Sequence, residues 1–143
     1  MKKIEKNALV PYTAEQMYKL VDDIDKYSEF LPWCSQSQVI ERAEDSVKGQ
    51  LTISYSQLNK SFVTQNINTP YSQIEMQLVE GPFKHLNGLW LFTSLGDDGC
   101  KVELKMEFEF ESKILDMTVG PIFGKLANSL VDAFTERASK IYD

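Results

Sequence analysis

The sequence is short of cysteine, histidine and positive charge, and each shortage excludes a class of protein. Cys34 and Cys100 are its only cysteines, too few for the disulfide framework of a small secreted domain. His85 is the only histidine, so a zinc site has nothing to build on. Its 15 Lys and Arg stand against 21 Asp and Glu, which gives a net charge of −6 at pH 7. Because a uniformly acidic chain is repelled by phosphate, we expect no direct DNA binding and no RNA binding that depends on broad neutralisation of phosphate charge.

Long apolar runs are missing as well. No stretch approaches the roughly 18 apolar residues of a membrane-spanning helix. The first residues, Met1–Glu5, turn polar at once and lack the apolar centre of a signal peptide. We therefore expect a cytoplasmic protein, peripheral to the inner membrane at most. Its 143 residues match the commonest domain size, so residues 1–143 are predicted to form a single domain.

The N-terminal part reads as one strand followed by two short helices. Residues 3–10 alternate as a strand, and Thr13 and Gln16 have the spacing of a helix capping box. Apolar residues then recur at helical spacing, at Met17, Leu20, Val21 and Ile24. A second short helix is expected to end at or before Leu31, because Pro32 disfavours helical geometry in the residue before it.

From residue 36 to residue 110 the apolar residues recur at every second position. The clearest run is Cys100–Phe110, where six apolar residues alternate with five charged ones. This pattern predicts an antiparallel strand with one dry and one wet face. Turns are expected at 43–47, 58–60, 68–72, 81–84 and 96–99. Such short links predict a meander of about six strands.

After Ser112 the apolar period returns to that of a helix. Gly120-Pro121 is expected to kink or restart it, and residues 121–142 carry one long apolar stripe. At 1.5 Å per residue this helix is about 33 Å long, close to the roughly 36 Å of the strand at 100–110. Matched lengths favour packing of helix on sheet. The predicted fold class is α+β: a curved antiparallel sheet of about seven strands around a long C-terminal helix, with two short helices after the first strand.

Residues that usually carry catalysis are scattered. His85 lies beside an expected turn, and nothing marks Cys34 or Cys100 as an activated thiol, although a pair with His85 stays open. The cluster Asp22, Asp23 and Asp25 is interpreted as solvated, and no glycine-rich phosphate loop is present. We predict that the protein is not an enzyme and holds no metal or catalytic cofactor.

A binding function is favoured instead, because a sheet that curls around a helix leaves apolar space between them. The strand at 86–95 is apolar on both faces, so it is either fully covered or exposes a patch to a partner or membrane. Residues 30–33 either plug the core or line the mouth of a pocket. The predicted ligand-binding residues are Phe30, Leu31, Trp33, Tyr55, Phe83, Trp90, Phe92, Phe123, Leu126 and Leu130.

Three motifs resemble those of a known family. Residues 27–34, Tyr-Ser-Glu-Phe-Leu-Pro-Trp-Cys, are similar to a Y-P-x-F-L-P-W-C signature, with Ser28 where proline is usual. Residues 81–86 with Trp90 and Phe92 resemble its second motif, and residues 121–124 with 131–138 resemble its third. The chain thus resembles the START-like proteins of helix-grip fold, within them the family of coenzyme Q-binding proteins and ribosome association toxins (RatA).

The resemblance implies two functions, and the shared motifs do not choose between them. The coenzyme Q-binding branch implies a bound ubiquinone, or another isoprenoid lipid, and support of respiration; this is the function we expect first. A quinone offers only acceptor oxygens, so it needs a donor such as Tyr55, Trp33 or Trp90. The RatA branch implies binding to the large ribosomal subunit and a block of subunit association. A cyclase or aromatase activity on the same fold is the third alternative.

Overall fold

The computed structural model describes residues 1–56 and 58–143, and its elements follow the predicted order. Strand β1 (Lys2–Val10) leads into helix α1 (Ala14–Asp22), the 3-10 turn η1 (Ile24–Lys26) and helix α2 (Tyr27–Phe30). Six strands follow: β2 (Cys34–Arg42), β3 (Ser46–Tyr55), β4 (Leu58–Thr69), β5 (Gln73–Glu80), β6 (Phe83–Leu95) and β7 (Gly99–Phe110). The chain then forms helices α3 (Lys113–Thr118), α4 (Gly120–Asn128) and α5 (Leu130–Tyr142).

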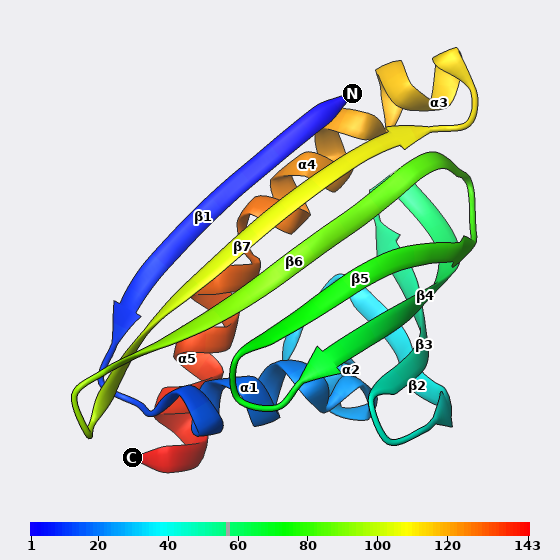
Figure 1. Cartoon of the computed structure of the whole chain (residues 1–143). Helices are drawn as coiled ribbons and strands as arrows, with labels where there is room; N and C mark the ends of the chain where they lie inside the picture. The colour runs from blue at the N-terminus through cyan, green and yellow to red at the C-terminus, as the bar shows by residue number, and fades with distance from the viewer. Residues whose placement is uncertain (57) are drawn as a thin grey trace.

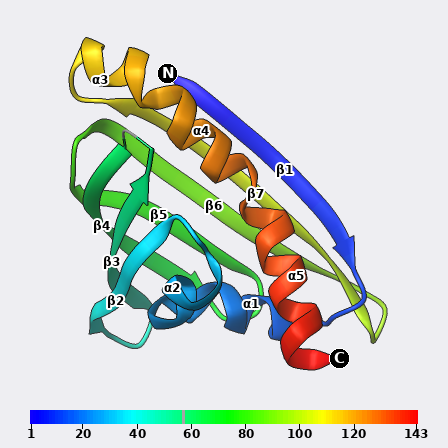
Figure 2. The same ribbon diagram turned by 180° about the vertical axis from the view of Figure 1, so that it is seen from behind.

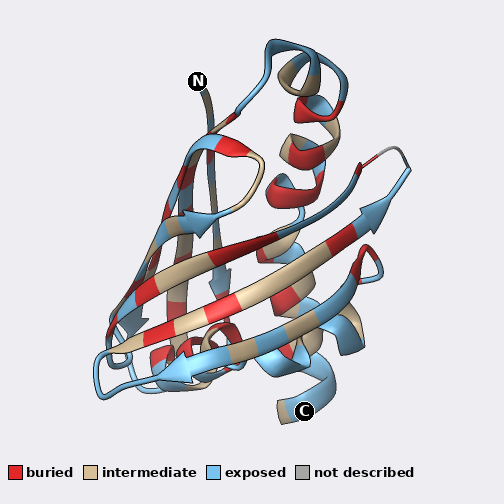
Figure 3. Ribbon diagram, turned by 90° about the vertical axis from the view of Figure 1, so that its right-hand side faces the viewer, coloured by how far each residue is buried: buried red, intermediate tan, exposed pale blue. Residues whose placement is uncertain are grey.

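The seven strands form one antiparallel sheet in the order β1-β7-β6-β5-β4-β3-β2. The sheet curls around α4 and α5, which run along its concave side (Figures 1 and 2). Buried residues gather on that inner side and on the facing sides of the two helices (Figure 3). The predicted α+β arrangement is confirmed.

Strand β7 shows why the alternation in the sequence predicted a half-buried strand. Its inward residues, from Cys100 to Phe110 at every second position, are all buried, whereas Lys105 between them is exposed. The strand pairs with β1 on one side and with β6 on the other, in registers that match Ile4 and Gly88 with Met106. The dry face of the sheet is thereby fixed along its whole length.

The predicted start of α1 is confirmed. The Thr13 hydroxyl accepts the backbone N–H of Gln16 at 3.1 Å, and the Gln16 side chain accepts the backbone N–H of Thr13 at 2.9 Å. Two donors that a helix start leaves free are satisfied together. Tyr12 and Met17 on either side of the cap are both buried, which fixes the entry of α1 into the core.

The predicted long C-terminal helix is confirmed, with one break at Ser129 that the sequence did not predict. Helix α4 ends at Asn128 and α5 begins at Leu130. The Ser129 hydroxyl donates to the Leu126 carbonyl at 2.7 Å and its N–H donates to the same oxygen at 3.1 Å. Such serine bonding competes with the regular helix ladder and bends it. The hydrophobic stripe cannot reveal this break.

One predicted turn is displaced. The turn expected at 58–60 falls inside β4, since Leu58 already pairs with Tyr55 across the hairpin. Ser56 takes the positive φ of 53° that the turn needs, and residue 57 lies outside the described residues. The polar residues Asn59 and Lys60 belong to the exposed end of a strand, which has the composition of a turn. The other four turns overlap their predicted positions.

Candidate functional site

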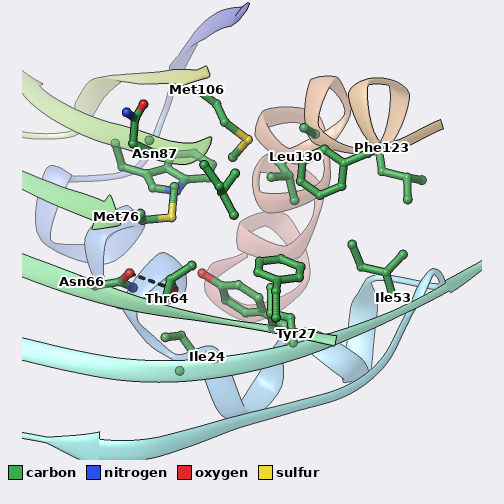
Figure 4. Close-up of a pocket in the computed structure, with 18 of the residues that line it drawn as sticks. Ile24, Tyr27, Ile53, Thr64, Asn66, Met76, Asn87, Met106, Phe123 and Leu130 are labelled. Carbon is green, nitrogen blue, oxygen red and sulfur yellow. Dashed lines mark hydrogen bonds between the residues drawn. The ribbon is translucent and has the colours of Figure 1, made fainter. Parts of the chain in front are cut away.

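A small cavity lies between the concave face of the sheet and the helices α4 and α5 (Figure 4). Its volume is about 70 Å³. That is half of the roughly 150 Å³ in which an apolar protein cavity holds one benzene ring. Its apolar wall includes Trp33, Leu51, Ile53, Phe62, Met76, Leu86, Trp90, Met106, Phe123, Leu126, Leu130 and Phe134. The cavity is therefore mainly apolar, and a ring-sized ligand enters only if part of the wall moves.

Two methionines form the part of the wall best able to move. Met76 of β5 and Met106 of β7 extend into the cavity beside Gly88 of β6 (Figure 4). A Cβ on Gly88 would lie 2.5 Å from the Met76 methyl group, so the glycine leaves the space that this methyl occupies. Methionine is unbranched and has three rotatable bonds, which lets it refill an irregular space at low cost.

One wall of the cavity is polar. Thr64 and Asn66 of β4 point inward, and Asn66 is only 5% exposed. The Thr64 hydroxyl donates to the Asn66 side-chain oxygen at 3.2 Å, as Figure 4 shows. Among the described residues, no hydrogen bond is found from the amide nitrogen of Asn66, whereas the fully buried side-chain oxygen without a partner is that of Asn68. A buried amide with unused donors faces an otherwise apolar space.

Tyr27 closes another side of the cavity with its hydroxyl already engaged. This hydroxyl donates to the carbonyl oxygen of Val21 at the end of α1. Burial raises the pKa of Tyr27 far above its usual range, and the nearby Asp22 carboxylate raises it further. Tyr27 is thus a neutral group whose proton is committed to the protein.

Half of the predicted ligand-binding residues line this cavity. Trp33 comes from the segment before β2 and Trp90 from β6, and the predicted residues of the helices reach it from α4 and α5. The five lining residues are Trp33, Trp90, Phe123, Leu126 and Leu130.

The remaining five predicted residues lie elsewhere. Phe30 packs against Phe134 with ring centroids 5.2 Å apart, under the guanidinium of Arg137, and Leu31 is 1% exposed in the core. Tyr55 is 40% exposed at the end of β3, with the Lys125 ammonium 6.0 Å from its ring.

Phe83 and Phe92 belong to aromatic packing beside the cavity. Phe83 stacks on Phe110 with ring centroids 4.5 Å apart and meets Phe123 at 5.1 Å. Phe92 packs on Trp90 at 6.4 Å and on Tyr18 at 5.8 Å. We call the group around Phe83 the phenylalanine cluster; its members are Phe62, Phe83, Phe108, Phe110 and Phe123.

The sequence reasoning missed the polar wall. Thr64 and Asn66 have the same phase along β4 as Phe62, whose ring lies in the core. Polar residues at the inward phase of a strand are the signal that points to them. It went unused because the alternation was interpreted from apolar residues alone.

The candidate catalytic groups do not gather at this cavity. His85 lies exposed on the outer face of β6 opposite Glu109, and burial raises the pKa of both cysteine thiols. Asp22 accepts hydrogen bonds from Arg42 at 3.0 Å and from Asn68 at 2.9 Å, so it joins strands to α1 and is not simply solvated. In the described part of the chain, no set of three metal-binding side chains gathers.

Comparison with known proteins places the chain in a family. The model of the family "Polyketide cyclase / dehydrase and lipid transport" matches residues 10–135. The chain belongs to this family, and it has the START-like fold that its motifs predicted. Among solved structures it is similar to a protein from Thermus thermophilus, with a TM-score of 0.85, 18% identity and coverage of 99% and 100% of the two chains. The Zhui aromatase/cyclase from Streptomyces shares the fold at a TM-score of 0.82 and 14% identity over 97% and 94% of the chains.

The sequence relatives are more specific. The chain is 46% identical to the ribosome association toxin RatA of Vibrio cholerae over 142 residues, which is 99% of each chain. It is 42% identical to RatA of Pseudomonas aeruginosa over 97% of this chain and 96% of that protein. A mitochondrial coenzyme Q-binding protein, COQ10 homolog B of Xenopus laevis, is 27% identical over 99% of this chain and 60% of that protein. Neither name describes an enzyme. Among the described residues, no helix combines the length and hydropathy required to cross a bilayer.

Proposed function

We propose that this chain associates with the ribosome in the manner of the RatA proteins, binding the large subunit and blocking subunit association. The observation that carries the proposal is the 42–46% identity to RatA proteins along nearly their whole length. The coenzyme Q-binding relative is more distant and only partly covered. The relatives therefore favour the second of the two functions that the motifs imply.

The distribution of charge favours one face of the sheet as the surface that contacts the ribosome. Although the net charge is −6, no Asp or Glu occurs between Ser46 and Ile74. On the outer face of β3, β4 and the first half of β2 lies a surface of amide and hydroxyl side chains, joined across the strands by hydrogen bonds of 2.7–3.4 Å. We call it the neutral face; its residues are Gln36, Gln38, Gln50, Thr52, Ser54, Asn59 and Ser61. Glu41, in the second half of β2, lies opposite Lys48 and outside this surface.

The neutral face suits ribosomal RNA better than the rest of the surface does. The outer faces of β5 and β7 carry Glu75, Glu103 and Glu107, which repel phosphate. Amide and hydroxyl side chains donate readily to phosphate and sugar oxygens. An acidic protein can thus approach RNA with this face toward it.

Overproduction in a bacterial host tests the proposed function. Sucrose gradients of the cell extract are expected to show more free subunits and fewer joined ribosomes. A gradient profile that stays unchanged at high expression rules the function out. For the contact face, Gln50→Glu is expected to weaken co-sedimentation with large subunits several-fold. The same change at Gln77, on the acidic outer face of β5, is the matched control and leaves co-sedimentation intact.

A second function, binding of an apolar molecule, is favoured by the cavity itself. Each buried CH₂ of a ligand contributes about 0.8 kcal/mol, so displacement of the methionine wall can be offset by an isoprenoid quinone or a similar lipid. A long isoprenoid tail exceeds the space, so part of it remains outside the protein. Transient contact with a membrane is the expected route by which the protein takes up such a ligand. Extraction of the purified protein followed by mass spectrometry tests this function. Lack of any saturable binding of quinones or lipids contradicts it.

The composition of the cavity wall supports a non-catalytic role. Among the described residues, the lining contains no Asp, Glu, His, Lys, Arg or Cys. General acid–base and nucleophilic catalysis most often use such groups, and the Tyr27 and Thr64 hydroxyls of the lining are both engaged in hydrogen bonds. Substitution His85→Gln is expected to leave any measured activity within a few-fold, whereas loss of a general acid–base lowers a rate by about 10²–10⁴.

A further inference from the structure

We infer that Asn66 selects the ligand of the cavity, and that the ligand is a flat, ring-sized apolar molecule with a hydrogen-bond acceptor, such as a ring carbonyl. The inference rests on the proposed apolar binding function. It starts from the amide nitrogen of Asn66, which lies on the cavity wall without a hydrogen-bond partner in the described chain. An unpaired donor is costly in an apolar space, so it is best explained by an acceptor that arrives with the ligand.

The other hydroxyl groups of the wall are already used. The Tyr27 hydroxyl donates to the Val21 carbonyl, and the Thr64 hydroxyl donates to Asn66. This second bond orients the Asn66 amide, because its oxygen is held by Thr64 and its nitrogen is left for the cavity (Figure 4). The remaining candidate donors on the wall are the indole N–H groups of Trp33 and Trp90 and the side-chain amide of Asn87, which is an exposed residue.

Asn66 is distinguished from its neighbour on the same strand. Asn68, two positions further along β4, donates its amide N–H to the Asp22 carboxylate at 2.9 Å and does not line the cavity. Its donor therefore has a structural task, whereas that of Asn66 has none. The two residues share burial and strand but use their amides in opposite ways: Asn66 accepts through its oxygen, whereas Asn68 donates through its nitrogen and its buried oxygen has no partner.

The cavity has to widen before it holds a ring. The existing 70 Å³ is too small for an aromatic ring, but it adjoins the flexible side chains of Met76 and Met106. Rotation of these two side chains widens the cavity above the inner face of β5, β6 and β7. A flat ring placed there has apolar contact on both faces and its acceptor toward β4.

Fluorescence titration tests the inference, because both tryptophans of the chain line the cavity and report binding directly. The probes are a short-chain ubiquinone, its hydroquinone form, and an alkylbenzene with a similar chain and no acceptor. In the unchanged protein the ubiquinone is expected to bind more tightly than the alkylbenzene. Asn66→Leu should weaken ubiquinone binding about 3- to 10-fold, the value of one hydrogen bond, and leave the alkylbenzene unaffected.

Two variants act as controls. Asn68→Leu changes an asparagine of the same strand that does not line the cavity, so it should retain ubiquinone affinity within about twofold. Trp90→Phe removes an indole N–H and keeps an aromatic ring; it should retain the preference for ubiquinone over alkylbenzene. Loss of that preference in Trp90→Phe instead of Asn66→Leu overturns the assignment.

The possible results separate the inference from the function on which it rests. If no probe binds the unchanged protein, the cavity function itself fails. If ubiquinone and alkylbenzene bind equally, or Asn66→Leu weakens both alike, the cavity function stands and the role of Asn66 is wrong. Tighter binding of the hydroquinone than of the quinone also overturns the inference, since it shows that the wall offers an acceptor.

Discussion

The phenylalanine cluster and the adjoining cavity are built from the same sheet and helix, yet they are packed in opposite ways. In the cluster, Phe108 and Phe123 meet at 4.7 Å between ring centroids, and Phe108 is 0% exposed. A few residues away, the wall turns to methionine and an amide around empty space. The difference shows that the cluster can supply stability while the cavity keeps room and an unused donor for binding.

The largest expected effect comes from opening the cluster. Phe108→Ala should lower the free energy of unfolding by about 3–5 kcal/mol, because it removes a fully buried ring that the surrounding structure cannot replace. This is comparable with the whole stability of many domains. Urea unfolding followed by circular dichroism measures it. A loss below about 1 kcal/mol shows that the cluster is not the stabilising region.

The second substitution lies at the cavity. Leu126→Ala should cost about 2 kcal/mol, at the low end for a buried leucine, since one side of Leu126 already faces empty space. The same unfolding measurement compares it with Phe108→Ala. If the two substitutions cost the same amount, the cavity is packed as tightly as the cluster and the comparison fails.

The fold follows from the sequence further than the cavity does. Alternation in Cys100–Phe110 and the Thr13–Gln16 cap depend on neighbours in sequence, and both were predicted correctly. Phe83 and Trp90 are both aromatic residues of β6, and the sequence alone does not distinguish their positions. The pairing of the strands places Phe83 in the phenylalanine cluster and Trp90 on the cavity wall. Prediction of Asn66 as a cavity residue would have required knowledge of which face of β4 points to the core. The break at Ser129 depends on a single hydroxyl contact, which no periodic pattern contains.

The two asparagines of β4 sharpen the comparison further. Asn68→Leu should cost about 1.5–3 kcal/mol, because it removes a hydrogen bond to the Asp22 carboxylate. Asn66→Leu should cost less, about 0.5–1.5 kcal/mol, because it loses only the neutral hydrogen bond that Thr64 donates to the Asn66 side-chain oxygen. Thermal unfolding of the two variants under one buffer condition decides. Equal losses contradict the view that Asn66 is kept for a ligand.

The smallest effect concerns pH in the packed part of the core. Burial raises the pKa of the Cys100 thiol to about 11, from 9.0 when exposed. The unfolded chain loses this proton from about pH 9 while the folded chain keeps it, so stability falls as pH rises from 9 to 11. Burial raises the pKa of Tyr18 and Tyr142 too, so they share the fall. Cys100→Ala should flatten it in part; an identical pH profile means that this thiol is not shielded.

Methionine methyl spectra test most directly whether the cavity is a binding site and not a packing defect. Of the five methionines, Met76 and Met106 line the cavity, Met17 is buried in the core, and Met1 and Met117 are exposed. The protein, labelled with ¹³C at these methyl groups, is titrated with a short-chain ubiquinone and followed by NMR. We predict that the Met76 and Met106 signals shift together and saturably while the Met17, Met1 and Met117 signals stay in place. Unmoved Met76 and Met106 signals, or shifts confined to Met1 and Met117, contradict the account.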